Sequence, residues 1–196
     1  MLRKSWAVAL LMIPLSAFAA EGPSYNYVGA DWFTGDIDAP GDEVDFDGFD
    51  VEGSFAFAET LFVKARYADG SLDDDRIDGD SEEISVGIGA HTNQWTGGVD
   101  LFGVLSYERA EIDLDVPGGS FSADDDGFGV EVGLRSMVTE ALELNGAVKY
   151  VDIGDTDGTG FEIGGVYSFT PAIAIVGAYL DGEDSSAWKV GGRLYF

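Results

Sequence analysis

Two copies of a short acidic pattern hold the residues best suited to chemistry in this sequence. The pattern Asp-(Ile/Leu)-Asp-(Ala/Val)-Pro-Gly occurs at 36–41 and at 113–118, and each copy has an aspartate six residues after its glycine. Carboxylates at the first, third and twelfth positions, with glycine at the sixth, are typical of a calcium loop. The candidate ligands are Asp36, Asp38, Asp47, Asp113, Asp115 and Asp124.

Other features of the same pattern favour a turn. Proline takes the fifth position, where a ligand is expected, and the twelfth residue is Asp rather than Glu. The flanking segments alternate like strands, whereas helices flank a calcium loop of this kind. Pro-Gly is itself common turn chemistry, because proline fixes one dihedral and glycine accepts the positive one. We therefore expect turns, no cofactor, and at most weak binding of Ca²⁺ or Mg²⁺.

Groups for acid–base or nucleophilic catalysis are sparse. The chain has one histidine, His91, and no cysteine. No glycine-rich segment precedes a helix as in a phosphate-binding loop. A hydrolase needs a histidine close to a carboxylate or serine, and His91 is expected at the end of its strand away from the acidic segments. A site made of carboxylates alone, such as Asp74 or Asp125, is the less favoured alternative, and we expect no enzymatic activity.

The amino-terminal residues have the pattern of a secretory signal. Arg3 and Lys4 precede an apolar run at 6–15, and Ala17-Phe-Ala19 is a cleavage site. A transmembrane helix needs about 20 apolar residues, so this run is too short. We predict a cleavable signal over 1–19 and a single domain over 20–196.

Ten later segments alternate apolar residues with small or polar ones. Five of them share a nine-residue pattern with a large apolar residue first, Val or Ile third, and Gly near the middle. These are 49–57, 84–92, 128–136, 161–169 and 188–196, and the other five are 25–33, 61–67, 99–107, 142–150 and 173–179. Short connections alternate with long acidic ones. We predict an all-β fold: a closed antiparallel transmembrane up-and-down β-barrel of ten strands, with short periplasmic turns and long acidic extracellular loops. Eight strands are the alternative.

One face of these strands is apolar, and we assign it to lipid. Aromatic residues near the strand ends are expected to form a girdle at the membrane border: Trp32, Tyr67, Tyr107, Tyr150, Tyr179 and Trp188. The alternative is the core of a soluble barrel, which the signal and the asymmetry of the connections disfavour.

The opposite face collects charges of both signs. The predicted lumen residues are Lys64, Arg66, Arg135, Lys149, Lys189 and Arg193, with Asp50, Glu52, Glu131 and Glu162 as acidic partners. Five further acidic residues share this face: Asp31, Glu83, Asp100, Glu108 and Glu143. Charges in a narrow interior are tolerated when they are paired and hydrogen-bonded. We predict an ion-pair lattice that plugs the barrel, and an open, selective pore is the alternative.

The last nine residues end on an aromatic carboxy-terminus. Trp188, Val190, Leu194 and Phe196 share one face, and this strand resembles the assembly signal that closes outer-membrane barrels. The expected partners are outer-membrane lipid, lipopolysaccharide and the barrel assembly machinery. A formal net charge of −27 makes nucleic acid a poor partner. No pattern specifies an oligomeric state.

Residues 20–27, Ala-Glu-Gly-Pro-Ser-Tyr-Asn-Tyr, resemble the opening of a xanthomonad-type family of small outer-membrane barrels linked to regulation by the diffusible signal factor. The resemblance implies a cell-surface role and carries no catalytic motif. We predict an outer-membrane β-barrel with a structural or interaction role at the cell surface. The alternative is a small passive channel, and an outer-membrane hydrolase is less favoured.

Overall fold

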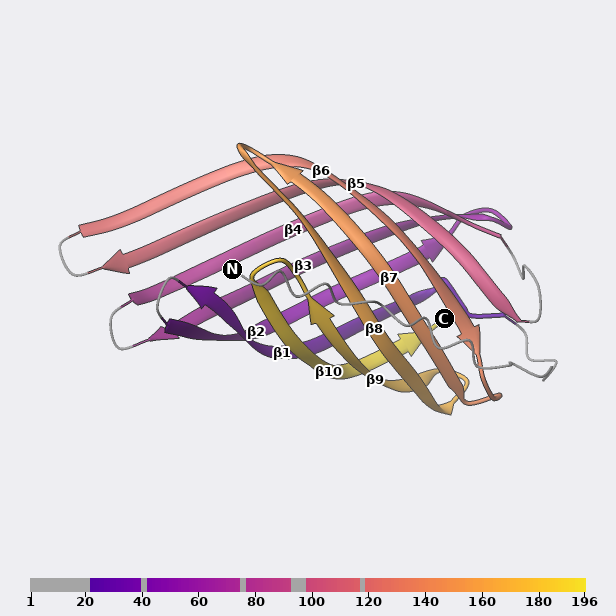
Figure 1. The fold of residues 1–196 in the computed structure, drawn as a ribbon. Helices are drawn as coiled ribbons and strands as arrows, with labels where there is room; N and C mark the ends of the chain where they lie inside the picture. Colours follow the sequence, from indigo (N-terminus) through magenta and orange to yellow (C-terminus); the bar gives the residue numbers. More distant parts are fainter. Residues whose placement is uncertain (1–21, 40–41, 75–76, 93–97, 117–118) are drawn as a thin grey trace, which may run out of the picture.

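The computed structural model describes residues 22–39, 42–74, 77–92, 98–116 and 119–196. Within these residues, ten strands pair antiparallel with their sequence neighbours, and β1 pairs with β10 to close a barrel (Figure 1). The strands are β1 (Tyr27–Ala39), β2 (Asp42–Ala56), β3 (Leu61–Asp74), β4 (Ile77–His91), β5 (Val99–Val116), β6 (Gly119–Met137), β7 (Leu142–Ile153), β8 (Thr156–Thr170), β9 (Ile173–Asp181) and β10 (Ser185–Tyr195). The ten-stranded prediction is confirmed, and the eight-stranded alternative is wrong. The predicted signal, 1–19, lies outside the described residues.

The two ends of the barrel differ in their connections. At one end, which we call the turn end, irregular connections such as 57–60, 138–141 and 171–172 join the strands. The first and last strands also meet there, because Tyr27 pairs with Tyr195 and the Phe196 amide donates to the Asn26 carbonyl at 3.2 Å. We call the opposite end the arm end. No helix in the described part of the chain is long and apolar enough to cross a membrane.

The long acidic segments differ from the prediction, because they are strands rather than loops. The pairing of β5 with β6 runs without interruption from Val99↔Ser136 to Val116↔Gly119. The segments predicted as loops at 34–45 and 68–82 likewise continue as paired strands. We call these extensions the arms. Their inward positions remain apolar, as at Phe46 and Ile112, so the alternation that forms the barrel wall continues through the acidic sequence.

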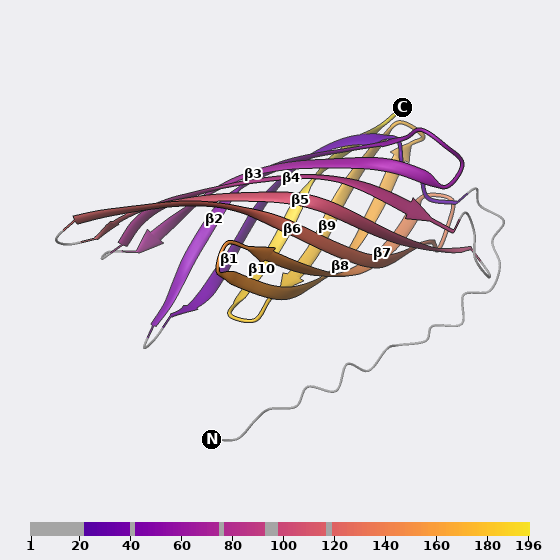
Figure 2. The same ribbon diagram turned by 90° about the horizontal axis from the view of Figure 1, so that it is seen from above.

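The arms are unequal in height. Strands β5 and β6 have 18 and 19 residues, whereas β9 and β10 have 9 and 11. The hairpins of β3–β6 therefore reach well past the β9–β10 hairpin, as both views show (Figures 1 and 2). The β7–β8 hairpin closes on Gly154 with a φ of 61°, a backbone conformation that short hairpin turns require and that glycine adopts easily. The arm end thus has a tall wall and a low wall.

Alternation along each strand separates the two faces of the wall. Val86, Ile88 and Leu105 point outward and are 53%, 53% and 58% exposed. The intervening positions point into the barrel, where Asp50 and Lys189 are buried. Exposed apolar side chains cover the outside below the arms, and charged side chains fill the inside.

Candidate functional site in the barrel lumen

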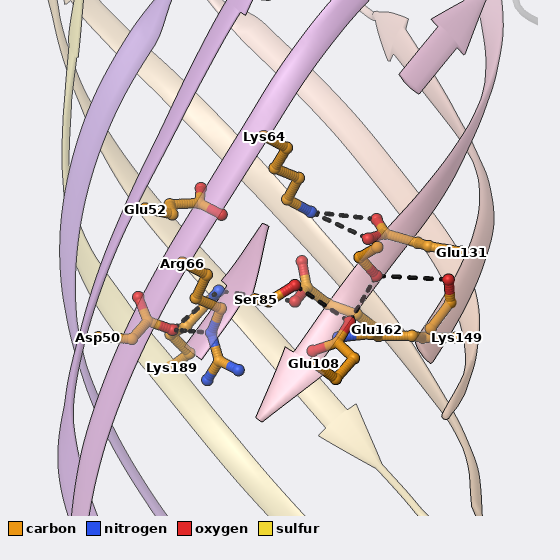
Figure 3. Close-up of polar contacts among 12 residues, drawn as sticks. Asp50, Glu52, Lys64, Arg66, Ser85, Glu108, Glu131, Lys149, Glu162 and Lys189 are labelled. Atoms are coloured by element: carbon orange, nitrogen blue, oxygen red, sulfur yellow. Dashed lines mark hydrogen bonds and ion pairs between the residues drawn. The ribbon is translucent and has the colours of Figure 1, made fainter. Parts of the chain in front are cut away.

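Ion pairs in the middle of the lumen join strands that are not neighbours in the barrel wall. Lys64 of β3 approaches Glu131 of β6, with 3.0 Å between Nζ and Oε2, and Lys149 lies 2.8 Å from Glu108 (Figure 3). Lysine and glutamate side chains are long enough to meet within the lumen, and together they fill part of it. Each pair therefore links two strands that no backbone ladder joins.

A second group surrounds Lys189 of β10. Its Nζ lies 3.8 Å from Asp31, 3.7 Å from Asp50 and 3.6 Å from Glu162. Arg66 donates from Nε to Asp50 at 3.1 Å and from Nη1 to Glu83 at 3.1 Å. The single positive charge of Lys189 therefore lies near three carboxylates and offsets their negative charge only in part.

Arginines and aromatic rings fill the lumen near the turn end. Arg135 forms a bidentate pair with Glu143 at 2.7 and 2.9 Å, and its guanidinium lies 4.6 Å from the centre of the Tyr25 ring. Arg193 lies 3.9 Å above the Tyr27 ring and donates to Glu52 at 2.6 Å. Guanidinium groups stack well on aromatic faces because the ring quadrupole attracts the cation.

Three further contacts complete this part of the lumen. The Tyr25 ring packs on Phe62, with ring centres 4.5 Å apart, and on His91 at 4.1 Å. His91 Nδ1 lies 2.9 Å from Asp100, which also accepts a hydrogen bond from the Thr92 hydroxyl at 2.8 Å. Burial raises the pKa of the Tyr25 phenol, so this group stays protonated. We call Tyr25, Tyr27, Phe62, Arg135 and Arg193 the arginine–aromatic layer.

The lumen contains a hollow of about 720 Å³ that extends towards the arms from the arginine–aromatic layer, whose five residues form part of its lining. Its lower part is lined by Lys64, Arg66, Lys149 and Glu162, and it extends upward between the arms. The hollow reaches the β9–β10 connection at Gly182–Asp184, on the low wall of the barrel. The interior is therefore a cup, packed towards the turn end and hollow towards the arms.

An aromatic border separates the apolar exterior from the acidic arms. The predicted girdle residues all face outward on their strands, and Trp32, Tyr107 and Trp188 are 49%, 50% and 66% exposed. The next outward residue on several strands is acidic: the Tyr67 hydroxyl donates to Asp69 and the Tyr179 hydroxyl to Asp181. An amphipathic ring with its polar edge towards acid and water suits a membrane interface.

The structure brings the predicted lumen residues together on the inward face. All six basic ones pair with carboxylates. Arg135 pairs with Glu143 and Lys149 with Glu108, two residues that the alternation also placed on the inward face. Tyr25, Tyr27 and Phe62 were not predicted as lumen residues. The alternation of β1 places Tyr27 on the inward face, so this residue could have been predicted from sequence. Phe62 could not, because its neighbours Leu61 and Val63 are also apolar and the segment shows no alternation. The predicted assembly residues Trp188, Val190, Leu194 and Phe196 are all exposed on the apolar exterior.

Five of the six candidate calcium ligands lie on the outside of the arms. Asp36 is directly opposite Asp45 in the β1–β2 pairing, and Asp47 is opposite Thr34. Asp38 and Asp113 are exposed, as is Asp124 opposite Glu111, whereas the side chain of Asp115 lies outside the described residues. Among the described residues, no group of three or more His, Cys, Asp or Glu side chains could hold a metal ion.

A closed barrel with an apolar exterior, an aromatic border and a charged interior defines a transmembrane β-barrel of the bacterial outer membrane. The comparison with family models agrees, since the family described as outer membrane protein beta-barrel domain matches residues 5–169. The chain belongs to this family. The predicted outer-membrane location is therefore confirmed.

Solved structures share the fold at low sequence identity. OprG from Pseudomonas aeruginosa is 16% identical over 90% of this chain and 99% of its own, with a TM-score of 0.52. Neisserial surface protein A is 15% identical over 88% and 98%, and the translocator domain of the autotransporter NalP from Neisseria meningitidis is 11% identical over 87% and 88%, both with TM-scores of 0.52. The search of curated proteins gives no match. These likenesses concern the fold alone.

Proposed function

We propose that the protein is a non-conducting, non-catalytic barrel of the cell surface, closed at the turn end by the arginine–aromatic layer. The observation that carries this proposal is the burial of that layer. Phe62 is 2% exposed, Tyr25 is 5%, and Arg135 is 6%. Groups so completely covered leave no continuous aqueous path beside them. The ion pairs above the layer add a second obstruction.

Opening the layer requires free energy for two reasons. Displacing Arg135 from Glu143 leaves a buried charge without its partner, which costs about 3–5 kcal/mol in comparable pairs. Moving Phe62 also requires space, and the ring already packs against Gly89. An ion that enters from the arm end therefore meets a barrier that thermal motion of single side chains does not remove.

Conductance in planar bilayers tests this proposal. Wild-type protein should give no reproducible current steps, whereas Tyr25→Ala with Phe62→Ala should open a small pore. Phe55→Ala with Phe57→Ala removes two aromatic rings from the exterior and serves as the control, with no steps expected. Steps from the wild type that the Tyr25/Phe62 variant leaves unchanged would instead support the small passive channel, which the hollow above the layer favours as the second candidate.

The exterior supports the proposed partners. The aromatic border and apolar band fit lipid, and the acidic arms above them fit the divalent cations that accompany lipopolysaccharide phosphates. We place the barrel across the outer membrane with the arms outside the cell and the turns in the periplasm, as is usual for such barrels. The resemblance of residues 20–27 to the xanthomonad-type barrels supports a surface role connected with diffusible signal factor regulation.

Weak Ca²⁺ or Mg²⁺ binding by the arms is part of the same proposal. Asp36 opposite Asp45 places two like charges side by side, and a cation near them relieves their repulsion. Calorimetry with Ca²⁺ tests this point: heat of binding at millimolar concentration is expected, and it should decrease in Asp36→Asn with Asp47→Asn. Absence of heat at that concentration removes the arms as cation sites.

A further inference from the structure

We propose that the hollow above the arginine–aromatic layer is a binding site for small amphipathic cations, molecules with an apolar body and an amino group. Neither the closure of the barrel nor its place in the membrane requires this hollow. Its volume of about 720 Å³ falls within the range of small-molecule sites, roughly 300–1,000 Å³. The proposal stands whether or not the barrel conducts, because the hollow lies above the layer that closes the lumen.

The upper part of the hollow is apolar. Inward-facing side chains of the arms line it: Phe33, Ile37, Phe46, Leu72, Ile112 and Leu180. The rings of Phe33 and Phe46 lie 6.0 Å apart, on neighbouring strands β1 and β2. Arms that are acidic outside and apolar inside are arranged like the wall of a soluble ligand-binding barrel. A ligand body that displaces water from this tier gains hydrophobic stabilisation.

The lining of the hollow has more acidic than basic residues, and the excess lies at the rim. Nine acidic and six basic residues line the hollow as a whole, and the basic ones already pair with carboxylates. Asp50 is 1% exposed, and its Oδ1 has no hydrogen-bond partner among the described residues. Glu162 forms an ion pair with Lys189 at 3.6 Å, and its side chain is 36% exposed. Asp50 Oδ1 therefore lacks a hydrogen-bond donor. A cationic amino group supplies such a donor, whereas a carboxylate ligand does not.

The entrance of the hollow also favours cations. The low wall of β9 and β10 brings the rim of the cup down to the β9–β10 connection. Glu183 and Asp184 line the hollow at this connection, and Asp157 and Asp181 lie near them in the lining. A rim with one sign of charge raises the local concentration of the opposite ion and speeds its association.

Calorimetry with three matched probes tests the proposal. The protein is placed in phosphatidylcholine nanodiscs and titrated with 4-phenylbutylamine, 4-phenylbutyrate and butylamine, and empty nanodiscs give the background. We expect saturable binding of phenylbutylamine at one site, at least about tenfold tighter than either of the other probes. Tighter binding of phenylbutyrate would overturn the charge argument, and equal binding of butylamine would overturn the role of the apolar tier. No saturable binding of any probe would overturn the site.

Two variants locate the binding. Glu162→Gln should weaken phenylbutylamine binding by about fivefold, since a partly exposed ion pair is lost. Asp124→Asn removes a charge of the same sign from the outside of an arm and should leave binding unchanged. If Glu162→Gln fails to give a heat-modifiable band, Glu83→Gln replaces it, because the Glu83 side chain is 58% exposed and tolerates change. Equal weakening by Asp124→Asn would show that net charge, not the cup, attracts the probe.

Discussion

Arg193 on the last strand donates to Glu52 on the second strand, with 2.6 Å between Nη2 and Oε1, across the first strand that lies between them. The two residues are 141 positions apart in the chain. The Arg193 guanidinium also covers the ring of Tyr27 on that first strand. Three side chains thus bind together the strands at the seam where the barrel closes.

Loss of either partner of this seam pair should destabilise the barrel. Arg193→Met leaves Glu52 buried and charged, and the expected cost is about 3–5 kcal/mol in the free energy of unfolding. Urea titration of protein refolded in vesicles measures it, with tryptophan emission as the signal. The double variant Glu52→Leu with Arg193→Met removes both charges and should recover most of the loss. If the double variant is no more stable than Arg193→Met, the pair is not the cause.

A side chain at Gly89 should disrupt the arginine–aromatic layer. A Cβ built there would overlap the Phe62 ring, so Gly89→Val should cost about 1–3 kcal/mol or prevent folding. Gly177→Val is the matched control, because no atom lies within 4 Å of the added Cβ and the position faces lipid. Phe62→Ala should rescue Gly89→Val in the same unfolding experiment. Failure of the rescue would place the strain elsewhere.

The depth of the apolar band can be read from charge substitutions along one strand. Ile88→Arg puts a cation among lipid chains and should cost about 2–4 kcal/mol near the middle of the membrane. Asp80→Arg lies on the same outward face of β4, beyond the aromatic border, and should have little effect. Equal costs for the two variants would contradict the assignment of the exterior.

Deletion of Phe196 should reduce insertion in cells without weakening the folded barrel. The side chain is 72% exposed, so few packing contacts are lost. We expect much less heat-modifiable protein in the outer-membrane fraction, but normal refolding into vesicles from urea. An equal defect in both experiments would mean that Phe196 acts through stability, and unchanged levels in cells would contradict its role as an assembly signal.

The barrel could be predicted from the sequence because the alternation of apolar and polar residues is visible within each single strand. The parity of Val86 and Ile88 against Ser85 and Gly87 reports which face is apolar without knowledge of the partner strand. The same alternation predicted that Lys64, Arg193 and the other lumen charges face inward. The repeated pattern then supplied the number of strands.

Pairing partners were harder to predict because they depend on register and on distance across the lumen. Arg135 and Glu143 meet because Arg135 lies opposite Asn145 in the β6–β7 ladder, which brings Glu143 into reach diagonally. Parity alone permits several other carboxylates. The arms were missed for a different reason: acidic residues discourage a strand assignment, although their alternation with Phe46, Leu72 and Ile112 continues the pattern of the wall.

The sign of charge on the arms also governs how closely copies of the protein can approach one another. Outward carboxylates such as Asp69 on β3, Asp126 on β6 and Asp181 on β9 stand on different sides of the barrel. At physiological ionic strength, exposed charges interact over about 8 Å. Two barrels side by side would bring these surfaces within that distance, so lipid and its cations are favoured between them. Like charge on the arms thus opposes close lateral contact between two copies.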